Sequence, residues 1–308
     1  MEGVTESSYN RVRTLSWRLQ SFFWRIIILK NKKLLIFCPT WRYNLPEIEG
    51  WDIYCNIQES SPVPPPGGKF GPRYLKAIHD VKPDFVIAVH SGCSESLFEA
   101  MDKPRQYGTK YITWSTDSYR HTSRVTTSDL HLSSIPDNTH RDSDNFLPLF
   151  SQYDGEVLPL EDRKHKYGLH CREYGNSNRF RQREIQKIKK TLKKDFFINQ
   201  LELHPYDYME EIKSYEYGIN VGVYEDGLPN FRSFELGCCG VMPISSDKNK
   251  KVLDFLFENR IIVYGDIEEI PSLIKPYDPV EVSRFYNEKH CLKARLVEMF
   301  DKYFGIKF

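Results

Sequence analysis

The sequence predicts an α/β protein with two doubly wound domains, and three observations support this fold class. Short apolar runs of strand length, which suit a buried parallel sheet, alternate with helical stretches. The alternation occurs in two series, separated by LPLFSQYDGEVLPLEDRK, and we place the domain boundary within residues 158–164. A chain of 308 residues with 40% hydrophobic content is long enough to give each series its own core.

Residues 1–32 are predicted to form an N-terminal amphipathic helix. Apolar side chains recur there at helical spacing among several arginines and lysines: Val12, Leu15, Leu19, Phe22 and Ile26. Such a helix either packs on the following sheet, which we favour, or makes a peripheral membrane contact through residues 9–33. The apolar stretch is too short to cross a bilayer, carries Arg18 and Arg25, and lacks the features of a signal peptide.

The first α/β domain is predicted over residues 33–160. Its strands are the apolar runs LLIFC (34–38), WDIYCNI (51–57), DFVIAVH (84–90) and KYITW (110–114). Helices are expected at 73–81 and at 94–101, the second with a capping box formed by Ser96 and Glu99. The intervening SSPVPPPGGKFGP (60–72) is too rich in proline and glycine for either element and is expected to be a surface loop.

The second α/β domain is predicted over residues 161–278. Its strands are YGLHC (167–171), DFFIN (195–199), YGINVGVY (217–224), GVMPIS (240–245) and RIIVYG (260–265). Helices are expected at 181–193, 206–214, 231–238, 251–258 and 267–274. A last helix begins at Pro279 and is expected to run to Phe304 without a break. Its apolar residues form an interrupted face that can pack on both domains.

Charge and cysteine content argue against several classes of protein. The 43 basic residues nearly balance the 42 acidic ones, so nucleic acid is not favoured as a partner, although it is not excluded. The seven cysteines form no CxxC pair and no zinc-type spacing with histidine. We therefore expect reduced thiols, a cytoplasmic location and no metal site.

Residues 217–246 carry the most informative pattern, which is strand, loop, short helix, glycine, strand. The helix presents Arg232 and Glu235 on one face, directly after a loop that ends at Asn230. At a helix start in a cleft, backbone N–H groups and an arginine suit a diphosphate, and a carboxylate one turn later can accept hydrogen bonds from ribose hydroxyls. A capped helix with a surface ion pair is the structural alternative.

This segment resembles the donor-binding element of group 1 glycosyltransferases, in particular the spore-maturation CgeB-like family, in which R-x-x-E-x-x-x-x-G follows a strand and a small-residue loop. The matching residues are Arg232, Glu235 and Gly240. The resemblance implies the GT-B fold, which is two Rossmann-like domains with an interdomain cleft and a C-terminal helix (279–308) that braces the first domain. It also implies a nucleotide-sugar donor, with no metal and no other cofactor.

The pattern departs from the family at one position that bears on stereochemistry. Many retaining members carry a glutamate eight residues before the second glutamate of the motif, and this chain has Gly227 there. Whether the reaction retains or inverts configuration therefore stays open.

Two further groups of residues complete the predicted site. Residues 163–194 contain twelve Lys or Arg and two acidic residues, and Arg172 and Arg179 lie in or next to a loop expected to face the donor phosphates. The predicted donor-binding set is Arg172, Arg179, Tyr224, Asn230, Phe231, Arg232, Ser233 and Glu235. On the acceptor side, His90 and Asp117 stand at strand ends, and Asp117 is the preferred general base for an inverting reaction.

These observations predict a metal-independent glycosyltransferase that moves a sugar from a nucleotide-diphosphate sugar to an acceptor hydroxyl. Two alternatives stay open. A sugar-nucleotide 2-epimerase uses the same architecture, and a non-catalytic module would bind a membrane or polyanion through its basic surface. The sugar, the base and the acceptor are not readable from the sequence.

Overall fold

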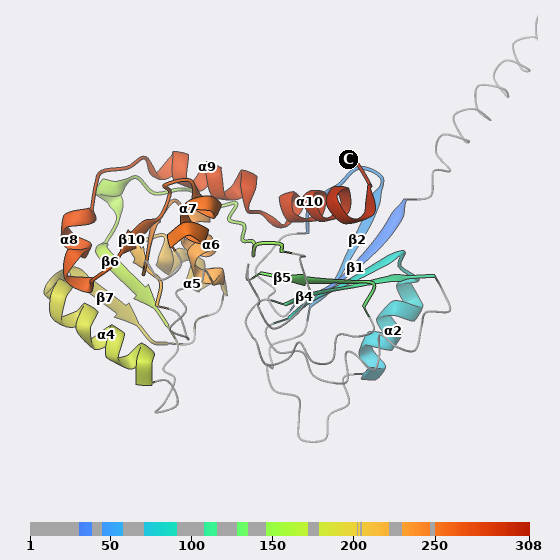
Figure 1. The fold of residues 1–308 in the computed structure, drawn as a ribbon, viewed down its shortest axis with the longest axis horizontal. Helices are drawn as coiled ribbons and strands as arrows, with labels where there is room; N and C mark the ends of the chain where they lie inside the picture. Colours follow the sequence, from blue (N-terminus) through green and yellow to red (C-terminus); the bar gives the residue numbers. More distant parts are fainter. Residues whose placement is uncertain are drawn as a thin grey trace, which may run out of the picture.

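The computed structural model describes residues 31–38, 45–57, 71–90, 108–115, 128–134, 146–171, 179–201, 203, 205–221, 230–246 and 250–308. They form two α/β domains that lie side by side, each built on a five-stranded parallel sheet (Figure 1). Residues 1–30 of the predicted N-terminal helix, the predicted helix at 94–101 and residues 60–70 of the predicted loop lie outside the described residues. Within the described ranges, no helix combines the length and apolar character needed to cross a membrane.

The first sheet has the strand order β2-β1-β3-β4-β5, with every neighbouring pair parallel. Its strands are β1 (Lys32–Cys38), β2 (Trp51–Ile57), β3 (Phe85–His90), β4 (Lys110–Ser115) and β5 (Leu130–Ser133), and α2 spans Gly71–Val81. The four predicted strands are confirmed. The sequence prediction missed β5, because LHLS is short and has only two apolar residues among its four.

The second sheet repeats this order as β10-β9-β8-β6-β7. Its strands are β6 (His165–His170), β7 (Phe196–Asn199), β8 (Tyr215–Ile219), β9 (Met242–Ser246) and β10 (Ile262–Tyr264). The helices are α4 (Arg179–Leu192), α5 (Pro205–Ile212), α6 (Phe231–Cys238), α7 (Lys250–Phe257) and α8 (Ile270–Leu273), with short 3-10 turns η3 (Leu160–Asp162), η4 (Lys193–Asp195) and η6 (Ile267–Glu269). Each domain is therefore a doubly wound, Rossmann-like unit, as predicted.

In both sheets the winding direction reverses between the first and third strands of the series. These pairs are β1 with β3 and β6 with β8. At such a point the connections leave the two neighbouring strands in opposite directions, which opens a crevice at their carboxyl ends where α/β proteins bind ligands. The strand order alone therefore indicates the carboxyl edge of each sheet as the place for a ligand site.

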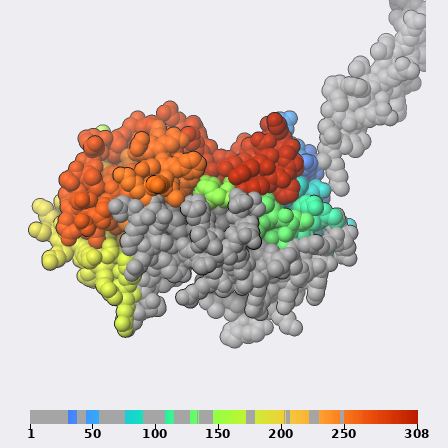
Figure 2. All heavy atoms as spheres, viewed as in Figure 1, coloured from blue at the N-terminus to red at the C-terminus, as the bar shows by residue number. Residues whose placement is uncertain are grey.

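The C-terminal segment braces both domains, but as two helices. The predicted single helix is wrong, because α9 (Pro279–Lys289) and α10 (Leu292–Phe304) are separated by His290 and Cys291. Cys291 is extended, with φ −77 and ψ 164, and its sulfur accepts a hydrogen bond from the Ala294 N–H at the start of α10. The break lets each helix follow the surface of its own domain, and Figure 2 shows the pair running along one side of the molecule.

The two helices belong to different hydrophobic cores. Val282 and Tyr286 of α9 are buried with the second sheet, whereas Leu296 and Phe300 of α10 are buried with the first. Burying large apolar side chains of this kind contributes about 1.5–3 kcal/mol each. The bracing role predicted for residues 279–308 is therefore confirmed at the level of packing.

Two glycines allow α9 to lie close to α6. A Cβ atom at Gly237 would stand 2.4 Å from the Tyr286 ring. At Gly240, which has φ +70, it would stand 2.5 Å from the carbonyl oxygen of Pro279. The final glycine of the sequence motif is therefore required both by its left-handed backbone and by the approach of the α9 backbone.

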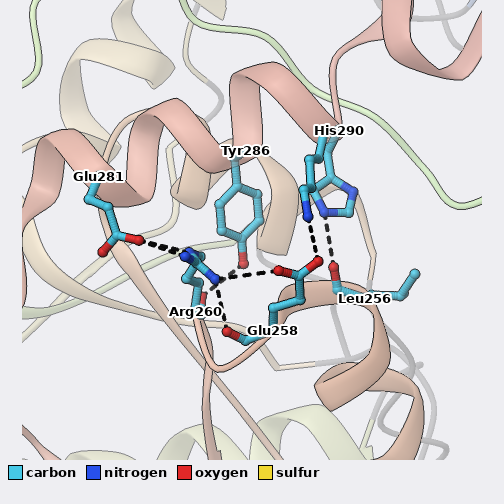
Figure 3. A network of polar contacts seen from close by, with 7 residues as sticks. Leu256, Glu258, Arg260, Glu281, Tyr286 and His290 are labelled. Atoms are coloured by element: carbon cyan, nitrogen blue, oxygen red, sulfur yellow. Dashed lines mark hydrogen bonds and ion pairs between the residues drawn. The ribbon is translucent and has the colours of Figure 1, made fainter.

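Polar contacts also fix α9 to the end of α7 and the turn after it (Figure 3). Arg260 Nη2 lies 2.6 Å from Glu281 Oε1, and its Nη1 lies 3.7 Å from Glu258 Oε2. The Tyr286 hydroxyl donates to the Arg260 carbonyl at 3.0 Å, and the His290 imidazole contacts the Leu256 carbonyl at 3.0 Å. Bonds at both ends of α9, buried as well as exposed, thus hold the helix.

The chain passes between the domains twice, and hydrogen bonds join the two passages. The Ser151 N–H donates to the His290 carbonyl at 2.9 Å, and Arg295 Nε donates to the Leu149 carbonyl at 3.2 Å. The Tyr153 N–H donates to Asn287 Oδ1 at 3.0 Å. The linker and the α9–α10 junction therefore form one connected unit.

Candidate functional site

The strongest candidate site lies at the carboxyl edge of the second sheet, where β6 and β8 are neighbours. The described residues of the predicted donor-binding set fall there. Arg179 is the exposed first residue of α4, which follows β6, and residues 230–235 begin α6, which follows β8. Arg172 and Tyr224 belong to the connections after the same two strands and lie outside the described residues.

The start of α6 is fixed by its cap and by a contact with the first domain. Asn230 is extended, and its Oδ1 accepts a hydrogen bond from the Arg232 N–H at 3.0 Å. Such a cap satisfies one of the free N–H groups at a helix start. Phe231 meets Phe150 of the first-domain core edge to face, with ring centroids 6.0 Å apart. This helix start therefore stands where the two domains meet.

Glu235 points into the protein. Its side chain is only 3% exposed, and Oε2 accepts a hydrogen bond from the Tyr208 hydroxyl at 2.6 Å. Burial of this kind does not fit the structural alternative of a solvent-exposed ion pair on the helix surface. A buried carboxylate needs hydrogen-bond donors around it, and Tyr208 on α5 supplies one.

A second carboxylate, that of Glu211, collects three hydrogen bonds at the same edge. His170 Nδ1 lies 2.7 Å from Oε1, the Tyr215 hydroxyl donates to Oε1 at 2.6 Å, and Asn199 Nδ2 donates to Oε2. Burial alone would raise the pKa of Glu211, but these hydrogen bonds hold that pKa below its ordinary value. Glu211 is therefore the anchor of an ionised, polar cluster.

Strand ends bring these residues together. His170 is the last residue of β6 and Asn199 the last of β7, while α5 carries Tyr208 and Glu211 three residues apart. Tyr208 also meets the His170 ring edge to face at 4.8 Å. We call His170, Asn199, Tyr208, Glu211, Tyr215 and Glu235 the α5 polar cluster.

Gly168 makes room for the tyrosine that reaches this cluster from the other end of the sheet. A Cβ atom at Gly168 would lie 2.1 Å from the ring of Tyr215, the first residue of β8. Burial, followed by the Glu211 carboxylate, raises the pKa of Tyr215 above its ordinary value, and the Arg232 guanidinium opposes this rise only in part. Arg232 therefore lies within electrostatic reach of the α5 polar cluster.

This arrangement can bind an anion next to hydroxyl groups. Arg232 and the start of α6 supply positive potential and N–H groups, and His170 is oriented by a carboxylate, as histidines in functional sites commonly are. Sequence reasoning missed five residues of the cluster: His170, Asn199, Tyr208, Glu211 and Tyr215. Only the i,i+3 spacing of Tyr208 and Glu211 on a short helix was visible in the sequence.

The basic segment around α4 divides into buried and exposed parts. Arg163 and Arg181 are buried, while Arg183, Lys189 and Lys190 are exposed. Lys187 pairs with Glu184 at 3.2 Å. Binding of an anionic partner to this surface stays a prediction.

One predicted acceptor residue, His90, stands at the corresponding edge of the first sheet. His90 ends β3 and is in register with Ser115 at the end of β4, but its side chain is not among the described ones. Asp117 follows β4 and lies outside the described residues. Their catalytic roles stay predictions.

Comparisons with known proteins add little. No protein-family model matches the chain, and no curated protein matches it in sequence. MurG of Acinetobacter baumannii aligns at 8% identity over 89% of this chain and 100% of its own, with a TM-score of 0.43. S. aureus MnaA, solved with UDP, aligns at 10% over 89% and 97%, also with 0.43. The UDP-GlcNAc 2-epimerase from Methanocaldococcus jannaschii aligns at 13% over 86% and 94%, with 0.38. Scores this low carry no argument about activity.

Proposed function

We propose that the chain is a GT-B glycosyltransferase whose nucleotide-sugar donor binds at the carboxyl edge of the second sheet. One observation carries this proposal. The residues selected by the sequence motif begin the helix that leaves β8, at the point where the winding of the sheet reverses between β6 and β8. Motif and topology are independent, since the motif is local and the strand order is not, and both select the same edge.

The donor diphosphate is assigned to Arg232, to the first turn of α6 and to Arg179. An arginine at a helix start offers a fixed positive charge and N–H donors at short range. As the bond between the sugar C1 and the phosphate oxygen breaks, charge grows on the leaving diphosphate, and such donors stabilise it. No step of this role needs a metal ion.

The acceptor hydroxyl is assigned to the first domain. The acceptor oxygen forms the new bond to the sugar C1, and in an inverting reaction its proton passes to Asp117. His90 is the second candidate, at the end of the neighbouring strand. The contact between Phe231 and Phe150 supports a site shared by both domains, because it brings the start of α6 against the first core.

A thermal-shift screen tests the proposal. UDP-, GDP-, ADP- and dTDP-glucose and a CMP-sugar are each added to the full chain. A ligand present at about a hundredfold its dissociation constant should add roughly 2.7 kcal/mol of stability. Product analysis then follows for the donor that binds. Transfer of the sugar supports the proposal, an epimerised nucleotide sugar supports a 2-epimerase, and binding without turnover supports a non-catalytic module. No response to any donor contradicts the donor site.

A further inference from the structure

Asn220 links the end of β8 to the first turn of α6. Its backbone N–H donates to the Ile244 carbonyl of β9 at 2.8 Å. Its side-chain Nδ2 donates to the hydroxyl of Ser233 at 2.8 Å, and both side chains are buried. The amide of Asn220 is thereby held against the helix start proposed to bind the donor.

Two buried polar atoms at this position lack a hydrogen-bond partner. Within the described part of the chain, they are Oδ1 of Asn220, whose side chain is 3% exposed, and Nε of Arg232, the residue before Ser233. Leaving a buried donor or acceptor unsatisfied destabilises a folded protein. Native proteins leave few such atoms unless a bound group satisfies them. One acceptor and one donor at the same helix turn point to a ligand.

We propose that Asn220 is a donor-binding residue whose amide oxygen accepts a hydrogen bond from a hydroxyl group of the nucleotide sugar. This inference rests on the proposed function. An amide oxygen only accepts hydrogen bonds, so it does not match a phosphate oxygen, which is also an acceptor at neutral pH. Nε of Arg232 is a donor and does match phosphate. Arg232 Nε would therefore donate to the diphosphate, and Asn220 Oδ1 would accept from an adjacent hydroxyl of the same ligand.

The hydroxyl has two sources with the same chemistry, the ribose and the transferred sugar. A site built to bind a hydroxyl discriminates strongly against an analogue that lacks it, because the site then keeps a buried unpaired group. This property makes both the source of the hydroxyl and the role of Asn220 measurable.

The experiment compares ligands and variants in one cycle. Binding of UDP-glucose, GDP-glucose and ADP-glucose, of analogues of each that lack one ribose or one glucose hydroxyl in turn, and of the free nucleoside diphosphates is measured by calorimetry. In the wild type, one deoxy analogue is expected to bind at least tenfold more weakly than its parent. The parent nucleotide sugar should bind Asn220→Ala at least tenfold more weakly than it binds the wild type. That deoxy analogue should bind the variant little more weakly than it binds the wild type. Weaker binding of a deoxyribose analogue assigns the ribose, and weaker binding of a deoxyglucose analogue assigns the sugar.

A matched variant separates binding from folding. Asn287 on α9 is a side-chain amide with partners on all sides: Nδ2 donates to Cys238 O and Ser283 Oγ, and Oδ1 accepts from the Tyr153 N–H. Asn287→Ala should lower the melting temperature and leave donor affinity unchanged. Asn220→Ala should lower donor affinity and leave the melting temperature nearly unchanged, since it removes an unsatisfied buried atom together with one hydrogen bond.

Two results overturn the inference. They are wild-type-like donor affinity of Asn220→Ala, whether or not its stability falls, and deoxy analogues that all bind the wild type as well as their parents do. The last arm needs no variant, so it decides the question even if Asn220→Ala does not fold. A wild type that binds none of the parent nucleotide sugars contradicts the proposed function instead, and the two failures are thereby distinguished.

Discussion

The Tyr208 hydroxyl donates a hydrogen bond to the buried Glu235 carboxylate at 2.6 Å, and this bond joins α5 to α6. Both side chains are buried, so the bond is made where no water can replace it. Its existence gives Glu235 a fixed orientation at the proposed donor site.

Tyr208→Phe removes this hydroxyl and leaves the carboxylate short of one donor. The free energy of unfolding should fall by about 1–3 kcal/mol, and the Michaelis constant for donor should rise because Glu235 is less well held. Urea denaturation and donor kinetics measure the two effects. Tyr217→Phe is the control, since it removes the 2.9 Å bond to the Lys275 carbonyl away from the helix start. Equal donor kinetics in both variants would show that the Tyr208 bond is only structural.

Arg232 and Glu235 should fail in different ways when changed. Arg232 is proposed to meet charge that grows during reaction, so Arg232→Ala should lower the catalytic constant as well as affinity. Glu235 is proposed to hold ribose hydroxyls that do not change, so Glu235→Gln should mainly raise the Michaelis constant. Steady-state kinetics with varied donor decides between the two patterns. Wild-type turnover in both variants would remove the proposed donor site.

Activity should survive chelation of divalent metals. The proposed leaving-group charge is met by arginines and a helix start, so a metal has no assigned task. Turnover in EDTA should match turnover without it. Loss of activity in EDTA that manganese restores would contradict the arginine-based role.

His290 should make the protein less stable in mild acid. Burial, together with the nearby Arg295 guanidinium and Lys289, lowers the pKa of His290 from 6.5 to about 3. Below pH 6.5 this histidine therefore binds a proton in the unfolded chain but stays neutral in the folded chain. The free energy of unfolding falls as the pH drops below 6.5. The slope approaches about 1.4 kcal/mol per pH unit for one proton.

Urea denaturation between pH 7.5 and 4.5 measures this slope. His290→Gln should flatten it, because the amide can still donate to the Leu256 carbonyl but cannot titrate. His165, whose pKa is also lowered by burial, is present in both proteins, so the difference isolates His290. Parallel stability curves would refute the assignment.

Gly240 and Gly305 offer a matched test of close packing. Both have a left-handed backbone, with φ +70 and +64, but a Cβ atom at Gly240 meets the Pro279 carbonyl whereas one at Gly305 meets nothing within 4 Å. Gly305→Ala should cost about 1 kcal/mol from backbone strain alone, and Gly240→Ala clearly more. Thermal denaturation compares them. Equal losses would mean that α9 yields to the added methyl group.

Local signals in the sequence predicted the elements well. The helix at 231–238 has the bounds expected from its cap at Asn230 and from Gly240 beyond its end, and the apolar runs predicted four of the first five strands. The break at His290 could not be seen, because its cause is the position of two separate domains. Apolar spacing on either side is compatible with one continuous helix.

The site was predictable only where its residues share one segment. Asn230, Arg232 and Glu235 lie on one helix start, and a motif can record that. The α5 polar cluster is assembled from the ends of β6 and β7, the start of β8, α5 and α6. His170 and Glu235, which are 65 positions apart, both contact Tyr208, and only the strand order brings them to it. Hydrogen bonding across such distances leaves no periodic trace in the sequence.

The placement of α10 also fixes the order in which the protein can be finished as it is made. The first sheet is synthesised early, yet Leu292, Leu296, Met299 and Phe300, which complete its core, are synthesised only after the second domain. The second domain has all its parts once α9 has emerged. The half of the molecule that is translated first is therefore the half that closes last. Until α10 (Leu292–Phe304) appears, the nascent chain exposes an apolar sheet face that a chaperone can recognise.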